Sequence, residues 1–166
     1  MLLEGHITPT WDINEYYNLE YTLGYHKEEK LNERYIKSGH LKDSMSLYNC
    51  FENYLKVDTQ DIRDQFSFLK DLALAVNLFK PGQYLPMHYD LYGKYRSVFS
   101  VDSADKIIRV MVMLENSIPG QILQINHRAI AKWSAGDWFG WQGREPHAFY
   151  NLSMSNRYAI QITGHL

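Results

Sequence analysis

The stretch Leu72–Phe79, Leu-Ala-Leu-Ala-Val-Asn-Leu-Phe, followed by the turn-forming pair Pro81-Gly82, decides the fold predicted for this chain. It is the first of six short strand-like runs that turn-forming residues separate from one another. These runs are Leu72–Phe79, Ile107–Leu114, Gln121–Trp133, Asp137–Trp141, His147–Leu152 and Arg157–Thr163. Several short strands broken by turns are typical of a jelly roll or barrel sandwich. We therefore predict an α+β, mainly β fold whose core, residues 71–166, is a double-stranded β-helix (a cupin-like jelly roll).

The N-terminal part, residues 1–70, is more polar and predicts helical and strand support for this core. The charged run His26–Lys37 reads as one helix, and Asp58 or Thr59 can cap a second from about Gln60 to Leu69. A short apolar stretch lies around Leu47–Leu55. We expect the helices to pack against one outer face of the core. Because 166 residues without a linker or repeat suit one domain, residues 1–166 are predicted to form a single domain.

The composition excludes several classes of protein. A hydrophobic share of 45% with 22% charged residues rules out disorder, collagen and coiled coil. A formal net charge of −2 without a basic stripe argues against nucleic acid or anionic lipid as a partner. No run approaches the ~18 apolar residues of a membrane span, and the segment Met1–His6 is too short and acidic for a signal peptide. Since the lone Cys50 cannot form an internal disulfide, we expect a cytoplasmic location; the oligomeric state stays open.

Three side chains in the second half could form a metal site. His88 and Asp90 lie two residues apart in an extended segment, so they project to the same face. A third donor, His147, follows among the late strands. Two histidines and one carboxylate leave three coordination positions of an octahedral ion open, as in non-haem Fe(II) oxygenases. Zinc usually has a closed set of protein ligands or a different mix of ligand types. The pair His26 and Glu28 has the same spacing but lies in a helical run, where such residues do not face each other.

Three polar residues interrupt or open apolar strands. Arg157 starts the last strand-like run, with small Ala159 on the same face. A buried guanidinium needs an anion, and its planar fork suits a carboxylate; a salt bridge within the protein or an exposed position is the alternative. Arg109 and Asn77 likewise interrupt apolar runs. Each of them either lines a pocket or has a structural role.

With these residues in view, the segment from about Leu72 to Leu166 resembles the Fe(II)/2-oxoglutarate-dependent oxygenases. Within them it is most similar to the aspartyl/asparaginyl β-hydroxylase branch and its small prolyl-hydroxylase-like and phage-encoded relatives. The resemblance is carried by Phe79–Asp90, Ile108–Val110, Ala135–Trp138, His147 and Arg157. The spacing from His88 to His147, and from His147 to Arg157, is typical of the superfamily. The N-terminal part, residues 1–70, resembles no family that we recognise.

This resemblance implies that His88, Asp90 and His147 bind Fe(II). It also implies that Arg157 holds the distal carboxylate of the cosubstrate 2-oxoglutarate. The implied reaction is hydroxylation of an unidentified substrate (a peptide side chain, an amino acid or a small metabolite) with release of succinate and carbon dioxide. Such an enzyme would be cytoplasmic and could be encoded by a virus.

The resemblance places Asn77 and Arg109 near the same cosubstrate. The sequence also departs from the mammalian β-hydroxylases, which lack the metal-binding carboxylate that Asp90 supplies here. Where that branch often has histidine, this chain has Met111. These departures weaken the transfer of its peptide substrate but leave the iron assignment in place.

The segment Leu91–Lys106 reads as a long structureless loop, which in a compact domain is usually functional. We expect it to cover the iron and to help choose the substrate; a disordered surface loop is the alternative. Trp133, Trp138 and Trp141 are expected in the core. Two other functions stay open: a cupin-like metal enzyme without 2-oxoglutarate, such as an isomerase or dioxygenase, and a non-catalytic binding β-sandwich. An ion pair between Arg157 and a protein carboxylate would favour either of them.

Overall fold

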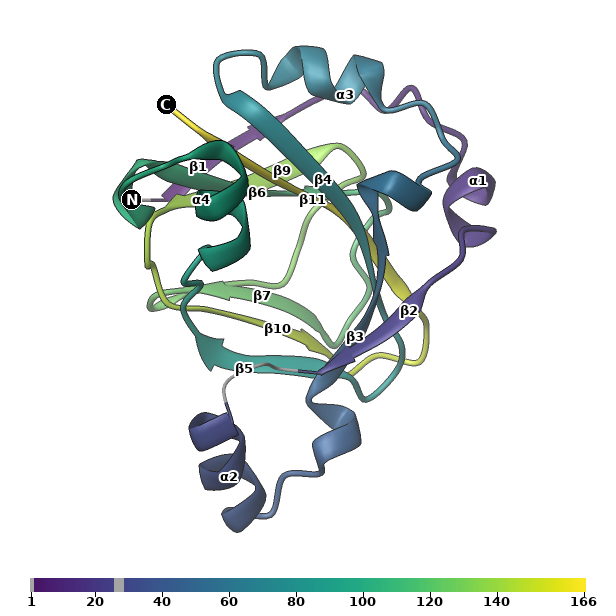
Figure 1. Cartoon of the computed structure of the whole chain (residues 1–166). Helices are drawn as coiled ribbons and strands as arrows, with labels where there is room; N and C mark the ends of the chain where they lie inside the picture. The colour runs from purple at the N-terminus through teal and green to yellow at the C-terminus, as the bar shows by residue number, and fades with distance from the viewer. Residues whose placement is uncertain (1, 26–28) are drawn as a thin grey trace.

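The structure is a computed structural model that describes residues 2–25 and 29–166. Eleven strands in these ranges form two antiparallel sheets that face each other (Figure 1). The larger sheet runs in the order β1 (Leu2–His6), β9 (Asp137–Gln142), β6 (Ile107–Met113), β11 (Arg157–His165), β4 (Lys70–Phe79), β3 (Ser46–Phe51) and β2 (Thr22–Tyr25). The smaller sheet has the order β5 (Tyr84–His88), β10 (His147–Asn151), β7 (Gln121–Ile125) and β8 (Arg128–Ile130). This is the predicted double-stranded β-helix.

The two faces of the larger sheet bury different sets of side chains. In β4, β6 and β11 successive residues alternate, so that Val76, Val110 and Ile160 belong to an outer apolar cluster. Their neighbours Met111 and Ala159 instead pack in the interior between the two sheets. Because Asn77, Arg109 and Arg157 share the parity of the inner set, the strand pattern turns all three toward the interior.

Two of the helices cover the outer face of the larger sheet, as predicted. Helix α1 (Ile13–Tyr17) places Tyr16 in the outer cluster, and α3 (Gln60–Gln65) adds Ile62. The Asp58 side chain accepts a hydrogen bond from the Gln60 backbone amide and so caps α3. The chain leaves the helix at Gln65, four residues before the predicted end.

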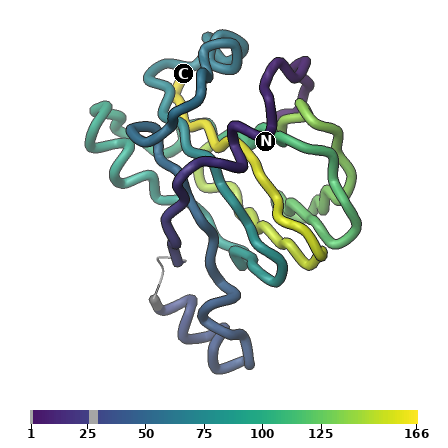
Figure 2. Tube along the Cα trace, turned by 90° about the vertical axis from the view of Figure 1, so that its right-hand side faces the viewer, coloured from purple at the N-terminus to yellow at the C-terminus, as the bar shows by residue number. Residues whose placement is uncertain are grey.

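Helix α2 (Glu29–Lys37) departs from this arrangement. It projects from one end of the molecule, beyond β5, in both views (Figures 1 and 2). The expectation that every N-terminal helix packs on one outer face is therefore wrong for α2, whose sequence is mostly charged and offers little apolar surface. The predicted helix start at His26 and the His26/Glu28 pair fall in residues 26–28, outside the described residues.

The N-terminal part of the chain was predicted to give helical and strand support, and its strands β1, β2 and β3 belong to the larger sheet itself. One strand prediction needs correction. The predicted single strand Gln121–Trp133 is wrong, because Asn126 adopts a left-handed conformation (φ 53°) that turns the chain back on itself. The result is the hairpin β7–β8.

The segment Leu91–Lys106 is neither structureless nor disordered. It forms helix α4 (Gly93–Phe99) and a short 3-10 helix, Ala104–Lys106. Four side chains of this segment are buried and pack with Ile107 as a small third cluster: Tyr92, Tyr95, Val101 and Ala104. Two more 3-10 helices flank β3, at Lys42–Ser44 and Glu52–Tyr54. Among the described residues no helix is both long and apolar enough to cross a bilayer.

Candidate metal centre

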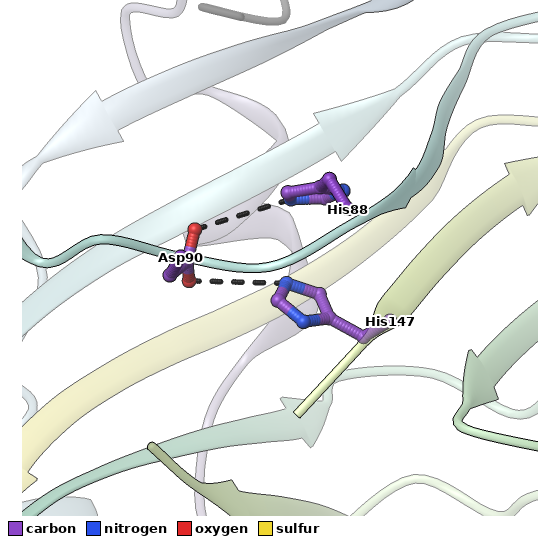
Figure 3. Close-up of side chains that lie close together, drawn as sticks. All are labelled: His88, Asp90 and His147. Atoms are coloured by element: carbon purple, nitrogen blue, oxygen red, sulfur yellow. Dashed lines mark ion pairs between the residues drawn. The ribbon is translucent and has the colours of Figure 1, made fainter. Parts of the chain in front are cut away.

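Strand pairing in the smaller sheet brings the two predicted histidine ligands together. His88 ends β5, His147 begins β10, and the two are direct partners across the strands. Their ring centroids lie 4.4 Å apart. Asp90, two residues past the end of β5, reaches toward both rings: its Oδ1 lies 3.9 Å from Nε2 of His88 and its Oδ2 3.8 Å from Nε2 of His147 (Figure 3). One potential ligand atom from each residue thus falls within 4.8 Å of the others, close enough to share one ion.

The backbone fixes which nitrogen each histidine presents. Nδ1 of His88 lies 2.7 Å from the carbonyl oxygen of Pro86, and Nδ1 of His147 lies 2.9 Å from that of Glu145. A carbonyl oxygen can only accept, so each Nδ1 carries the proton and donates it. Each Nε2 is then left with a lone pair on the side of Asp90. This is the outer hydrogen bonding that orients metal-binding histidines.

The charges at the site favour the protonation states that bind a divalent cation. Burial would raise the pKa of Asp90, but the charge of Arg109 and the two imidazoles outweigh it, and the pKa lies below its ordinary value. Nη2 of Arg109 lies 2.8 Å from Oδ2 of Asp90. Burial lowers the pKa of His147 to about 3. At neutral pH the carboxylate is therefore ionised and His147 is neutral.

Arg157 is buried in the interior without a carboxylate partner. Its side chain is 3% exposed, and its guanidinium lies over the rings of Trp133, Phe149 and Phe79 at 4.9, 5.1 and 5.7 Å. Nη2 contacts Sδ of Met113 at 3.6 Å, while Nε and Nη1 have no hydrogen-bond partner among residues 2–25 and 29–166. No carboxylate of the described residues forms an ion pair with it. Burial lowers its pKa to about 9, which leaves it charged at neutral pH and suited to an anion.

Arg157 and the triad share the same interior. The ring of Phe149 lies 6.1 Å from that of His147 and is also one of the three rings under the guanidinium. Both groups therefore lie near the same aromatic side chain in the interior.

Arg109 and Asn77 both face the interior, with contacts that differ. Arg109 contacts Asp90, so its nearest charged neighbour is a candidate ligand. Asn77 is 2% exposed and its Nδ2 donates to Oδ1 of Asn49 at 2.7 Å, across the β3–β4 pair. Asn49 was missed from the sequence, although it is a polar residue between Tyr48 and Cys50 in an apolar stretch. Whether Asn77 or Arg109 contacts a cosubstrate stays a prediction.

The tryptophans are largely core residues, as predicted. Trp133 and Trp141 are buried in the inner cluster, whereas Trp138 is partly buried against the outer one. Two of them also border the site: the Trp141 ring lies 4.4 Å from that of His147, and Trp133 lies under Arg157.

Comparison with known proteins bears on the fold. No protein-family model matches the sequence, and no curated protein matches it either. Among solved structures, a prolyl-4-hydroxylase from Pseudomonas putida superposes with a TM-score of 0.55 and 12% identity, covering 92% of this chain and 96% of that one. A cupin-superfamily sugar phosphate isomerase from Silicibacter pomeroyi gives a TM-score of 0.52 and 11% identity, covering 95% of this chain and 76% of that one. The chain is therefore a double-stranded β-helix protein of the jelly-roll type, with a His-Asp-His group that could hold a metal ion.

Proposed function

We propose that this chain is an Fe(II)- and 2-oxoglutarate-dependent dioxygenase that hydroxylates a small-molecule or peptide substrate. The observation that carries the proposal is the unpartnered guanidinium of Arg157 in the same interior as the triad. Keeping a charge buried without a partner costs several kcal/mol. A protein that bound only the metal ion would therefore be more stable with an apolar residue in place of Arg157. A cosubstrate with a terminal carboxylate supplies the missing anion.

The residues fit the metal that the proposal requires. Two neutral imidazoles from His88 and His147 and one carboxylate oxygen of Asp90 would occupy three positions of an octahedral ion and leave three open. When bound, Fe(II) and 2-oxoglutarate would activate molecular oxygen, with one oxygen atom entering the substrate C–H bond and the other the succinate that is released with carbon dioxide. The ligand set matches this use better than a closed structural zinc site.

The protein's own contribution at the far end of the site is to bind and orient the cosubstrate. Nε and Nη1 of Arg157 are free to donate to a carboxylate. Arg157 is only 3% exposed, and low exposure strengthens an ion pair formed there. Asn77, paired with Asn49 on the same inner face, would contact the cosubstrate as the family resemblance implies. Arg109 would act at the other end, through the carboxylate of Asp90.

A second candidate function is a different cupin-type metal chemistry without 2-oxoglutarate. The triad alone suits this as well, and one fold neighbour is named a sugar phosphate isomerase. The two candidates differ at Arg157, which the second one leaves without a use. A non-catalytic binding role would leave both the open metal positions and Arg157 unused.

Anaerobic titration tests the proposal. Fe(II) and then 2-oxoglutarate are added under argon, and the visible charge-transfer band of an iron-chelated keto acid is followed, with succinate release measured on admitting oxygen. Arg157→Met should keep metal binding and lose the 2-oxoglutarate-dependent band. Arg128→Met, at an exposed arginine of β8, is the matched control and should behave as the wild type. A wild-type protein that binds metal yet gives neither band nor succinate would favour the second candidate.

A further inference from the structure

Tyr92, two residues past the candidate ligand Asp90, has a strained backbone conformation. Its φ of 54° and ψ of 25° lie in the left-handed region, which crowds the side chain of a bulky residue. Such a conformation persists where the surroundings fix it, and it is concentrated at functional sites. The side chain of Tyr92 is buried in the cluster that holds α4. Tertiary contacts, and not the intrinsic backbone preference of tyrosine, therefore hold Tyr92 in this conformation.

In this buried position the ring of Tyr92 contacts Arg109. The Arg109 guanidinium carbon lies 5.2 Å from the centroid of the Tyr92 ring, within the range of a cation–π interaction. The same guanidinium gives Nη2 to Oδ2 of Asp90 at 2.8 Å. One short turn of chain thus supplies two contacts to Arg109, a carboxylate from Asp90 and a ring from Tyr92.

The polar atoms around this contact point to the same role. Arg109 and Trp141 are direct partners across β6 and β9, and the Tyr92 hydroxyl lies close to both side chains. Within the described part of the chain, Oη of Tyr92, Nε of Arg109 and Nε1 of Trp141 are buried without a regular hydrogen bond. The arginine and indole nitrogens can only donate. Of the three, the tyrosine hydroxyl alone can accept, so Tyr92 is the group able to orient the other two.

We propose that Tyr92 is a positioning residue that holds Arg109 on Oδ2 of Asp90 and thereby leaves Oδ1 to a metal ion. A carboxylate with one oxygen engaged in this way presents a single ligand atom and keeps the other metal positions open. The inference rests on the metal site of the proposed function and on no property of 2-oxoglutarate. It also gives the segment Leu91–Lys106 a connection to the site, since Tyr92 belongs to the cluster that anchors α4.

Binding of Mn(II), followed by electron paramagnetic resonance of the free ion, tests the proposal in the full chain. Tyr92→Asn removes the ring while asparagine tolerates the left-handed backbone, and it should weaken Mn(II) binding about 10- to 100-fold, as loss of an outer-shell partner does. Tyr92→Phe keeps the ring over Arg109 but removes the hydroxyl, so its Mn(II) affinity should fall between those of the wild type and Tyr92→Asn. The matched control is Tyr95→Leu in α4, the helix that Tyr92 precedes: Tyr95 is buried against Phe99, and no contact joins it to Arg109 among the described residues. Its loss should leave Mn(II) affinity at the wild-type value.

A second readout needs no metal. In the apo protein, the Nε–H signal of Arg109 in ¹H–¹⁵N spectra should exchange slowly with water in the wild type and quickly in Tyr92→Asn, with Tyr92→Phe between the two. If circular dichroism shows Tyr92→Asn unfolded, Tyr92→Met replaces it. Wild-type affinity and slow exchange in the ring-deleting variant, or an equal loss of affinity in Tyr95→Leu, overturns the proposal.

The outcomes also separate this inference from the proposed function. A wild type that binds Mn(II) but turns over no 2-oxoglutarate counts against the oxygenase and leaves the role of Tyr92 to be decided by its variants. A wild type that binds no Mn(II) overturns both.

Discussion

His88 and His147 face each other across β5 and β10 with ring centroids 4.4 Å apart, although they are distant in the sequence. The Nδ1–H of each ring donates a hydrogen bond to the backbone carbonyl two residues before it, so local backbone contacts fix the orientation of both rings. The pair is therefore built into the smaller sheet before any ion binds. Asp90 completes it from the chain that leaves β5.

Replacing His147 with glutamine should abolish tight metal binding. The amide cannot supply the neutral imidazole nitrogen that the strand pairing aims at Asp90. Titration with Mn(II) or Co(II) measures the loss. His127→Gln, at an exposed histidine in the β7–β8 turn, is the matched control and should bind as the wild type does. Equal affinities in the two variants would contradict the assignment of His147 as a ligand.

Asp90→Ala should destabilise the apo protein, because it leaves Arg109 as a buried cation without its carboxylate. Breaking a fully buried pair costs about 3–5 kcal/mol, and since the Asp90 side chain is 27% exposed, we expect about 1–3 kcal/mol in urea unfolding. Adding Arg109→Met should recover part of the loss. The Arg109→Met single variant completes the cycle. If Arg109→Met lowers the free energy of unfolding by the same amount in the wild type and in Asp90→Ala, the two residues are not coupled.

Arg157→Met should leave the apo protein as stable as the wild type or stabilise it by about 1 kcal/mol or more, because it removes an unpaired buried charge from an apolar site. The same substitution should abolish 2-oxoglutarate binding to Mn(II)-loaded protein, measured by calorimetry. Stability and cosubstrate binding are thus predicted to change in opposite directions. A destabilised variant that still binds 2-oxoglutarate would show that Arg157 is structural.

The stability of the apo protein should fall as the pH is lowered below about 6.5. His147 has a pKa of about 3 in the folded state and an ordinary value of 6.5 when unfolded, so between these values the unfolded chain binds the extra proton. The free energy of unfolding should therefore decrease with falling pH by up to about 1.4 kcal/mol per unit. The lowered pKa of Asp90 adds a further loss at more acidic pH.

Urea unfolding of the wild type and of His147→Gln at a series of pH values measures this dependence. The variant should show a shallower slope across the same window, since its amide does not titrate. Identical slopes would assign the pH dependence to other groups.

Much of the site follows from strand alternation alone. Period-two patterning in β4, β6 and β11 puts Asn77, Arg109 and Arg157 on the inner face, because residues of one parity in a strand always share a face. The segment Leu91–Lys106 also carried a helical signal that the prediction did not use: Tyr95 and Phe99, four residues apart, pack against each other.

The sequence by itself determined the chemistry of the donor set, the β-rich character of the chain and the side of each strand that carries its polar residues, because these depend on residue type and on a short local repeat. Only the tertiary structure decided that His88 faces His147, that Arg109 engages Asp90 and that Arg157 has no carboxylate partner. The first depends on the pairing of β5 with β10 within the smaller sheet, and the second on the approach of the chain after β5 to β6 of the larger sheet, so both join segments far apart in the chain. The left-handed turn at Tyr92 belongs with them, since burial against neighbouring strands holds a conformation that its own sequence disfavours.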